Sequence, residues 1–577
     1  MRKTKIVCTL GPASEDKDTI REMILAGMDV ARLNFSHGTH DDHLAKIQII
    51  KELRKELGLP VAILLDTKGP EIRLGKVEPG CFVHEGDSFV LTPQPTMGCK
   101  GKVTITYAGL HNDIQVGDRI LIDDGLITLL VTSIDGEEIH TLVEHGGEVK
   151  SQKGVNIPGA RISLPALTEQ DLIDLKFGVA QEVDFIAASF IRTAQDVLDI
   201  RKVLEEFGDP QVQIISKIEN RQGYENLESI LQVSDGIMVA RGDLGVEMPI
   251  EEIPVAQKIM IRESNQAAKP VITATQMLES MVRNPTPTRA EATDVANAIY
   301  DGTDAVMLSA ESAAGKYPVE SVRMLASIAH ATEETLKKNV PLKFPPQSHD
   351  SVTYAVSEAT VETAHKLEAV AIITPTTSGF TARKVAMFRP NCPIYAATTR
   401  ERVRRRLNLV RGVLPVMMND VIGTDALYKE LVRAGTDGGF LSPGDLVVLT
   451  AGIPIGVSGT TNLMKVHVVG EVLLKGKGIG HQRVKGRLRR ANEPLEEGDI
   501  LLLEKASEEI LDGLERCGAL ITRAGRFPAR AVQRAISREI PVLIDVGFTE
   551  ELLSGEMFEV DAKLGLVFSA STSFPQE

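Results

Sequence analysis

Three side chains near the middle of the chain have the residue types and the spacing of a metal-assisted catalytic centre. Lys217 and Glu219 flank Ile218 at the end of a short apolar segment, and Asp243 follows the next such segment. In a β-strand, alternation points Lys217 and Glu219 to the same face. Two carboxylates on adjacent strands suit Mg²⁺, which takes oxygen ligands and completes its coordination with water and substrate. A lysine beside such an ion can neutralise charge on a phosphoryl group during its transfer.

A second polar group lies earlier in the chain. It combines hydroxyl, amide and carboxylate oxygens with two arginines: Arg32, Asn34, Ser36, His37, Asp66, Thr67 and Arg73. The oxygens suit a second, monovalent cation, and the arginines suit phosphate. From spacing alone, two other interpretations stay open. One is a surface ion-pair network for this group, and the other is a buried ion pair between Lys217 and Glu219.

The elements that position these residues are short apolar segments in the first half of the chain. Eight of them cover residues 5–10, 28–35, 61–66, 184–190, 213–218, 236–240, 270–275 and 305–309. Their apolar character is continuous rather than alternating, which is typical of parallel strands buried on both faces. Helix-like stretches such as 19–28 and 194–207 lie between them. Eight strand–helix units predict an α/β fold of the (β/α)8 TIM barrel type.

Polar residues follow the C-terminal end of each predicted strand. In chain order they are Thr9, Arg32, Asn34, Ser36, Asp66, Thr67, Ser189, Lys217, Glu219, Arg241, Asp243, Thr275, Ser309 and Glu311. Barrel enzymes build their active sites on this rim, so the pattern predicts the catalytic centre there. Solvated loops would also carry polar residues, but they do not explain apolar strands that end in paired Lys/Glu and Arg/Asp.

A long interruption separates the third predicted strand from the fourth. Residues 71–165 are too many for a βα connection. They contain short alternating segments at 119–134 and 138–145, with turn signals at Asp124-Gly125 and Asp135-Gly136. We expect a small inserted β-barrel domain that forms a lid over the active site. The catalytic barrel then comprises residues 1–70 and 166–345.

The rest of the chain predicts two further modules. Residues 346–473 alternate strand-like and helix-like segments and predict an open α/β domain. A basic, glycine-rich stretch, KGKGIGHQRVKGRLRR, follows and is predicted to be a linker. An extra α/β domain completes residues 474–577 with the segments DILLLEKA, GALITR and IPVLIDVG.

Composition limits the classes of function. The 577 residues suggest three or four domains, and 43% hydrophobic with 25% charged residues is typical of globular chains. A net charge of −15 argues against nucleic acid and anionic membranes as partners. Five cysteines without a CxxC pair favour reduced thiols and a cytoplasmic location. We expect no signal peptide or transmembrane helix, and no Walker A, GxGxxG, HExxH or zinc motif is found in the sequence.

Several long motifs resemble the pyruvate kinase family. They are ARLNFSHG (31–38), LDTKGPEIR (65–73), KGVNIPGA (153–160), KIEN (217–220), MVARGDLGVE (238–247), ITATQMLESM (272–281) and NPTPTRAEATDVANAIYDGTDAVMLS (284–309). They stand in the family's order, and the resemblance covers roughly residues 1–470. It implies transfer of the phosphoryl group of phosphoenolpyruvate to ADP, giving pyruvate and ATP in the last step of glycolysis. It also implies regulation by a phosphorylated metabolite and a homotetramer.

The resemblance implies a separate role for each residue of the catalytic centre. Glu219 and Asp243 would bind Mg²⁺ or Mn²⁺. Lys217 would stabilise the migrating phosphoryl group, and Arg32 would hold the phosphate. The two acidic residues would act through the metal on both the transfer and the enolate that it leaves.

Further roles are implied around this centre. The substrate carboxylate would meet the backbone of Gly242 and Asp243 and the side chain of Thr275, which would also lie near the path of the proton. The family's K⁺ site matches Asn34, Ser36, Asp66 and Thr67. The nucleotide would approach Asn34, His37, Arg73 and Lys153. In this family Glu at the position of Glu71 accompanies K⁺ dependence, so the resemblance implies a K⁺ requirement.

A loop in the 346–473 domain resembles the family's effector phosphate site. Its members are Thr376, Thr377, Ser378, Gly379 and Thr381. Hydroxyls and backbone N–H groups at the start of a helix can bind an anion, and the alternative is an ordinary helix cap. Phe380 stands where some members of the family carry a basic residue. AMP, a sugar monophosphate and fructose 1,6-bisphosphate therefore all stay open as effectors.

The C-terminal module resembles the extra domain of some bacterial pyruvate kinases. That domain is similar to the phosphohistidine domain of phosphoenolpyruvate-utilising enzymes, in which a Thr-Ser-His-Ala segment carries the phosphorylated histidine. The matching segment here is Pro528-Ala529-Arg530-Ala531. Arg530 replaces the histidine, which implies a structural or regulatory module without phosphohistidine chemistry.

Two other classes of function compete with this one. An aldolase or lyase that binds an enolate through Mg²⁺ would explain Glu219 and Asp243, but not residues 71–165 or the 65–73 motif. A metabolite-binding regulator without activity would not need Lys217, Arg32 and Thr275 intact. A coupled assay with phosphoenolpyruvate, ADP, Mg²⁺ and K⁺ separates the three.

Overall fold

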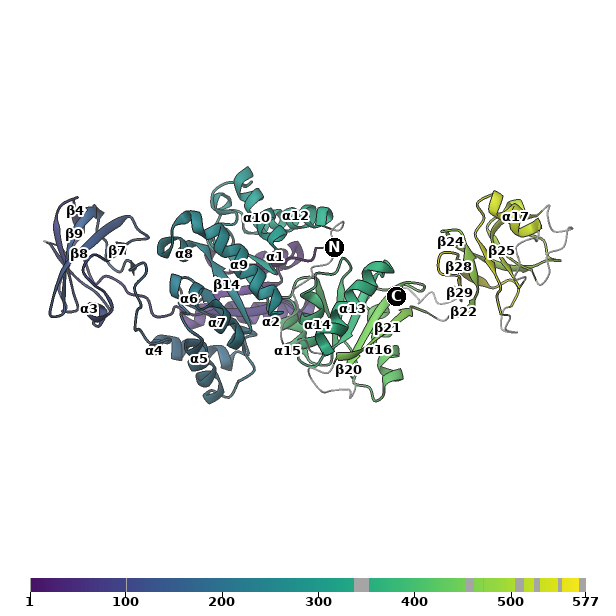
Figure 1. Ribbon diagram of the computed structural model, residues 1–577, viewed down its shortest axis with the longest axis horizontal. Coiled ribbons are helices and arrows are strands. Elements are labelled where there is room, and N and C mark those ends of the chain that lie inside the picture. The colour runs from purple at the N-terminus through teal and green to yellow at the C-terminus, as the bar shows by residue number, and fades with distance from the viewer. Residues whose placement is uncertain are drawn as a thin grey trace. The chain divides into compact units, whose positions relative to one another are not determined.

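Eight parallel strands close into a barrel (Figure 1). The computed structural model describes residues 2–99, 101–336, 352–452, 461–470, 472–503, 513–523, 530–547 and 553–569. The barrel strands are β1 (Lys5–Thr9), β2 (Val30–Asn34), β3 (Ala62–Asp66), β12 (Phe185–Ala188), β13 (Gln213–Ile218), β14 (Gly236–Ala240), β15 (Val271–Ala274) and β16 (Ala305–Leu308). Their order around the barrel is β1-β16-β15-β14-β13-β12-β3-β2. The predicted strands and the (β/α)8 fold are confirmed.

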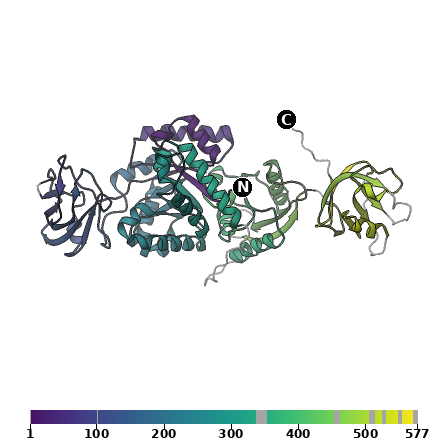
Figure 2. The same ribbon diagram turned by 90° about the horizontal axis from the view of Figure 1, so that it is seen from above.

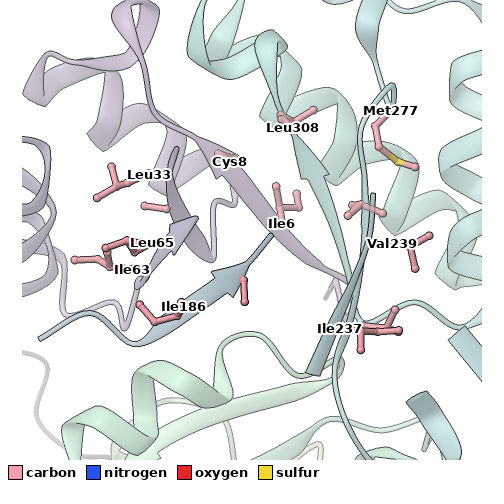
Figure 3. Close-up of a cluster of buried hydrophobic side chains, with 14 of the residues drawn as sticks. Ile6, Cys8, Leu33, Ile63, Leu65, Ile186, Ile237, Val239, Met277 and Leu308 are labelled. Atoms are coloured by element: carbon pink, nitrogen blue, oxygen red, sulfur yellow. The ribbon is translucent and has the colours of Figure 1, made fainter. Parts of the chain in front are cut away.

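The continuous apolar character of the strands has a direct cause in their packing. Neighbouring residues point to opposite faces of the sheet, and both faces are buried. Ile6 and Cys8 join the layer between strands and helices, whereas Val7 joins the cluster inside the barrel. Ile63 and Leu64 divide in the same way. Figure 3 shows part of the outer layer, to which all eight barrel strands contribute buried side chains.

Helices surround the barrel strands (Figure 1). The longer ones are α1 (Lys17–Ala26), α2 (His40–Leu57), α4 (Glu169–Ala180), α5 (Ala194–Glu206), α7 (Leu227–Val233), α9 (Ile253–Gln266), α10 (Arg289–Asp301) and α12 (Pro318–Leu336). Short helices α6 (Arg221–Glu225), α8 (Arg241–Glu247) and α11 (Ala310–Ala313) follow strands on the active-site side. Helices α2, α4, α5 and α10 each begin with a threonine cap and an acidic residue three positions later. These capping boxes satisfy backbone N–H groups that a helix start otherwise leaves without partners.

The interruption between β3 and β12 folds as a β-rich insertion joined to the barrel by two chain segments (Figure 2). Its strands are β4 (Phe82–Val83), β5 (Ser88–Thr92), β6 (Lys102–Thr104), β7 (Arg119–Ile122), β8 (Ile127–Asp135), β9 (Glu138–His145), β10 (Gly147–Glu148) and β11 (Val155–Asn156), with one short helix, α3 (Leu110–Asp113). A six-stranded sheet, β11-β7-β8-β9-β5-β6, and the pair β10-β4 form a half-barrel around one apolar core. We call residues 71–165 the inserted domain.

The predicted α/β module after the barrel is also found. It contains α13 (Val352–Lys366), β17 (Ala371–Pro375), α14 (Phe380–Ala386), β18 (Ile394–Thr398), α15 (Glu401–Leu407), β19 (Val413–Met417), α16 (Thr424–Asp437), β20 (Leu446–Gly452) and β21 (Thr461–Val468). The sheet order is β19-β18-β17-β20-β21. The predicted boundary at residues 345 and 346 lies outside the described residues.

The C-terminal region is β-rich. It contains β22 (Val472–Lys475), β23 (Lys477–Ile479), β24 (Arg483–Arg490), β25 (Asp499–Leu503), β26 (Cys517–Thr522), α17 (Arg530–Ser537), β27 (Val542–Ile544), β28 (Met557–Asp561) and β29 (Leu566–Ser569). Its sheet has the order β22-β29-β28-β24-β25-β26-β27-β23. The three predicted segments at 499–503, 517–522 and 542–544 are neighbouring parallel strands.

The linker prediction for the basic stretch is wrong, because the stretch forms β23 and β24 of that sheet. In β24, the buried Gly486 and Leu488 alternate with exposed basic residues such as Arg487. One face of the strand therefore packs on the sheet's apolar core while the other carries charge. The run of charges concealed this alternation in the sequence.

The cysteines and the helices bear on two predictions made from the sequence. All five cysteines are free thiols, and Cys8 is fully buried in the barrel wall. Within the described residues, every helix is too short or too polar to cross a bilayer.

Candidate active site

The strand register brings the predicted residues to one rim of the barrel. Asn34 and Asp66 are paired positions at the ends of β2 and β3, and Ala187 of β12 pairs with Asp66. Strand β13 is the next neighbour of β12, and its Lys217 pairs with Met238 of β14. Because the strands are parallel, the residues that follow them face a common opening.

Lys217 lies at the centre of this rim and has three oxygen partners. Its Nζ is 3.1 Å from Asp66 Oδ1 and 2.9 Å from Glu219 Oε1, and it donates to Ser189 Oγ at 2.8 Å. Burial opposes the charged form of Lys217, but Asp66 and Glu219 outweigh it, and the pKa of the ammonium is raised. Lys217 is therefore a fixed positive charge at any physiological pH.

Asp66 connects this lysine to the predicted phosphate-binding arginine. Arg32 Nε donates to Asp66 Oδ2 at 2.6 Å, and Arg32 Nη1 donates to Thr9 Oγ1 at 2.8 Å. Burial works against the charge on Asp66, but Arg32 and Lys217 together lower the pKa of its carboxyl group. The aspartate thus holds both cations in place on the rim. Arg32 keeps further N–H groups for an anion, whereas the three donors of Lys217 already have partners and one of them would be exchanged for an anion.

Glu219 and Asp243 form an acidic pair beside Lys217, in which Glu219 is buried and Asp243 keeps an exposed surface. Burial raises the pKa of Glu219 to about 7, with Lys217 opposing the rise and Asp243 adding to it. Burial also raises the pKa of Asp243, although Lys217 opposes the shift. Counted with Asp66, the site holds three carboxylates against two cations, Lys217 and Arg32. One carboxylate of the site is therefore in excess, and a further cation would neutralise it.

The donor set fits a hard divalent cation. Carboxylate oxygens in a partly enclosed site are the ligands that Mg²⁺ and Mn²⁺ prefer. In the part of the chain that the structure describes, no group of three or more His, Cys, Asp or Glu side chains is arranged to hold a metal ion. An ion bound by Glu219 and Asp243 would thus complete its coordination with substrate and water, as Mg²⁺ commonly does.

Thr275 adopts a backbone conformation that its residue type disfavours. Its φ is +65° and that of Gln276 is +55°, and a positive φ is costly for a β-branched residue. The Thr275 hydroxyl accepts from the N–H of Gly242 at 2.9 Å and donates to the carbonyl of Ala274 at 2.7 Å. Arg241 Nη2 donates to the Thr275 carbonyl at 2.5 Å. The Gly242 N–H, predicted to meet the substrate carboxylate, is therefore bonded to Thr275 here.

The predicted monovalent-cation residues lie together at the ends of β2 and β3. Asn34 and Asp66 occupy paired positions, and Thr67 follows directly. The Asn34 side-chain oxygen accepts from the N–H of Ser36 at 3.1 Å. His37 is exposed on the same loop. These contacts group the oxygens without assigning an ion to them.

The other two predicted nucleotide residues belong to the inserted domain. Arg73 donates to Glu71 Oε2 through Nε at 2.8 Å and through Nη2 at 2.5 Å, and to the Gln152 carbonyl at 2.8 Å. Lys153 Nζ is 2.8 Å from Asp123 Oδ1. Arg73 and Lys153 are thus both held within the inserted domain. The Glu71 carboxylate accepts hydrogen bonds from Arg73 rather than from a residue of the barrel rim.

The predicted effector loop forms the connection between β17 and α14. The Thr376 hydroxyl accepts from the N–H of Gly379 at 2.8 Å, and Gly379 has φ +82°, which a side chain would disfavour. Thr377 is half-buried and Ser378 is exposed, and Thr381 lies in the first turn of α14. The loop therefore presents hydroxyls before α14, whose N-cap residue, Gly379, makes no side-chain cap bond.

Arg530, which replaces the predicted phosphohistidine, is the first residue of α17. The two residues before it in the matching segment, at 528 and 529, lie outside the described residues. The absence of a histidine at position 530 is a fact of the sequence.

Two contacts at the centre were not assigned from the sequence. Ser189 was recognised only as a polar residue at the end of a strand, yet its hydroxyl accepts from Lys217 and donates to the Thr67 carbonyl at 2.6 Å. Phe190 has φ +55°, and its N–H donates to Glu219 Oε2 at 2.6 Å. The position after strand β12 was the available signal, but a backbone donor leaves no trace in residue type.

The chain is similar over nearly its whole length to proteins of one family. Residues 1–322 match the family model "Pyruvate kinase, barrel domain", and residues 354–467 match "Pyruvate kinase, alpha/beta domain". The chain is 47% identical over 583 residues to a pyruvate kinase of Geobacillus stearothermophilus, with 99% of both chains covered. It is also 47% identical to one of Bacillus licheniformis, covering 99% of this chain and 100% of that one. A crystal structure of a pyruvate kinase from Cryptosporidium parvum superposes with a TM-score of 0.76 at 37% identity, covering 81% of this chain and 96% of that one.

Proposed function

The chain belongs to the pyruvate kinase family and transfers the phosphoryl group of phosphoenolpyruvate to ADP, and from this premise we propose that Lys217 and Arg32 bind that phosphoryl group. The observation that carries this assignment is the position of Lys217 between Asp66, Glu219 and Ser189. The lysine is held rigidly and stays charged. A preorganised cation of this kind stabilises charge that develops during the transfer.

Arg32 would hold the phosphate whose charge Lys217 stabilises. Its contacts to Asp66 and Thr9 use Nε and Nη1, which fixes the plane of the guanidinium. The planar group can then hold a phosphate through paired N–H donors. Lys217 and Arg32 would lie on either side of Asp66, so the phosphoryl group is oriented before it moves.

Glu219 and Asp243 are the residues that would hold the divalent cation, which the family generally uses together with a monovalent one. We assign Mg²⁺ or Mn²⁺ here, supported by the excess of carboxylates over cations in the site. When bound, the ion supplies charge neutralisation for the phosphoryl oxygens and for the enolate. The chain's own contribution is to keep the pair ionised, which Lys217 favours by its charge, and to orient Glu219 through the N–H of Phe190.

The substrate carboxylate would lie against Gly242, Asp243 and Thr275. In this arrangement the Thr275 hydroxyl would exchange its bond from the Gly242 N–H for one to the substrate. The strained backbone at Thr275 supports a functional position, since such conformations cluster at active sites. Thr275 would also be close to the carbon that is protonated when the enolate becomes pyruvate.

A K⁺ ion and the nucleotide complete the proposal. Asn34, Ser36, Asp66 and Thr67 would bind K⁺ at the ends of β2 and β3. Asn34, His37, Arg73 and Lys153 would contact ADP or ATP. For the last two residues, this requires the inserted domain to act as a lid, with their present carboxylate partners exchanged for phosphate.

The proposal extends to regulation and assembly. A phosphorylated metabolite would bind Thr376, Thr377, Ser378, Gly379 and Thr381, where hydroxyls gather before α14. We also propose a cytoplasmic homotetramer. The free cysteines are consistent with a reducing compartment.

The role of Lys217 is tested with Lys217→Met in an assay that couples pyruvate formation to a second enzyme. We expect kcat to fall by at least about a hundredfold, the usual effect of losing one preorganised charge-stabilising group. Lys202→Met, on the exposed face of α5, is the matched control and should keep full activity. A folded Lys217→Met enzyme with a kcat near the control would refute the assignment.

A further inference from the structure

The inserted domain and the barrel share a hydrogen bond between two side chains. Asn156 Nδ2 in β11 donates to Glu247 Oε1 at the end of α8, at 2.9 Å. Nearby, Arg192 donates to the carbonyls of Ile162 and Leu164 at 2.8 and 2.5 Å. Those two bonds anchor the returning chain through its backbone. The Asn156–Glu247 bond, in contrast, depends on the identity of both side chains.

Each partner lies close in the chain to a residue of the proposed site. Asn156 is three positions after Lys153, and β11 is fixed in the inserted sheet by pairing with β7. Glu247 is four positions after Asp243, one helical turn along α8. The bond thus connects the nucleotide side of the proposed site with its metal side.

The side-chain bond borders a pocket that is open to solvent. A cavity of about 120 Å³ lies beside the bond, lined by Asn156, Ile157, Phe190, Asn220 and Glu247 among others. Burial raises the pKa of Glu247, and the bond from Asn156 opposes the rise. Glu247 is half-buried, and the donor from Asn156 offsets part of the cost of removing its carboxylate from water.

We propose that Asn156 and Glu247 are positioning residues that set the place of Lys153 relative to α8, and thereby the affinity for ADP. This inference rests on the proposed roles of Lys153 and Asp243. Loss of the bond lets the inserted domain occupy more orientations, so the nucleotide must order it on binding. Phosphoenolpyruvate, held by barrel residues alone, does not bear that cost.

The test exchanges donor and acceptor. N156D places two carboxylates together and should raise KM for ADP about tenfold. E247Q keeps an acceptor for Asn156 and should stay within about twofold of the unmodified enzyme. The double variant N156D/E247Q restores a bond in the opposite direction, from the Gln amide to the Asp carboxylate, and should recover most of the loss.

Several controls keep the outcome interpretable. N156A removes the donor without adding charge and should also raise KM for ADP, which decides the matter if N156D folds poorly. E225Q changes an exposed carboxylate on the same cavity and should have no effect. In every variant, thermal stabilisation by phosphoenolpyruvate with Mg²⁺ should match the unmodified protein.

The results distinguish a failure of the positioning role from a failure of the proposed active site. An unchanged KM for ADP in N156D and N156A, or a double variant no better than N156D, overturns the positioning role. If phosphoenolpyruvate and Mg²⁺ fail to stabilise even the unmodified protein, the proposed site is wrong instead. A drop in melting temperature without a change in KM for ADP would show a purely structural bond and would also overturn the proposal.

Discussion

Replacing Glu219 with glutamine should make the metal-free protein more stable at neutral pH. Glu219 is buried beside Asp243, and burial raises its pKa to about 7. At neutral pH the folded protein must therefore keep a carboxylate that is close to protonation. Glutamine has the same shape without the charge, and it can still accept from the N–H of Phe190.

The sign and size of the effect follow from the two pKa values. The ordinary glutamate pKa is 4.5, and the folded value is about 7. Between these values the folded state binds more protons than the unfolded state, so the free energy of unfolding falls as pH rises. At 1.36 kcal/mol per pH unit, the loss attributable to Glu219 is about 3 kcal/mol once the pH exceeds 7. In Glu219→Gln this part of the pH dependence is absent.

Urea unfolding from pH 4.5 to 8, in chelator and then in Mg²⁺, measures this difference. Without metal, the variant should gain on the unmodified protein as pH rises. With Mg²⁺, the unmodified protein should recover stability above pH 7, where the acidic pair is ionised, and the variant should respond little. Glu225→Gln, an exposed carboxylate, serves as the matched control. Parallel pH profiles of Glu219→Gln and the unmodified protein would refute the reasoning.

Three further predictions concern ions, stability and the C-terminal region. Activity should require K⁺ and be at least about tenfold lower in sodium or Tris buffer. The variant Glu71→Lys should lose that dependence, because its ammonium supplies a fixed positive charge. Full activity of the unmodified enzyme without K⁺ contradicts this prediction. Asp184→Asn leaves Arg54 and Arg405 without their buried carboxylate partner and should cost about 3–5 kcal/mol in urea unfolding, with a loss under 1 kcal/mol counting against the network. Incubation with labelled phosphoenolpyruvate should leave no acid-labile phosphate on the C-terminal region, because Arg530 replaces the histidine; label found there would reverse that conclusion.

The barrel was predictable because its strands are simple in physical terms. Buried on both faces, they give continuous apolar runs, and the parallel arrangement places the residue after each run on one rim. Lys217 and Glu219 could therefore be assigned to one site from their spacing. The contact between Lys217 and Asp66 could not be predicted from spacing, since it depends on β13, β12 and β3 being neighbours in a closed sheet.

Other features had no local signal. The bond between Asn156 and Glu247 joins residues about 90 positions apart in two different domains. Nothing in either residue type distinguishes it from an exposed polar side chain. In β24, the opposite problem arose, because exposed arginines and lysines concealed the inward-facing Gly486 and Leu488. Composition outweighed periodicity there, and the strand was mistaken for a linker.

The insertion between β3 and β12 has a consequence for the order in which the molecule folds. These strands are neighbours, yet paired Asp66 and Ala187 are about 120 residues apart in the chain. The ends of the inserted domain are held together by the bridge between Arg73 and Gly154. Once that bridge forms, only about 40 residues of open chain separate the two strands.

Shortening the open chain about threefold lowers the entropic cost of pairing β3 with β12 by about 1 kcal/mol. If closure of the barrel limits the rate, prior folding of the inserted domain accelerates it about fivefold. Hydrogen-exchange pulse labelling during refolding should then protect β8 and β9 before β12. The domain that interrupts the barrel in sequence would thus act as the clamp that allows the barrel to close.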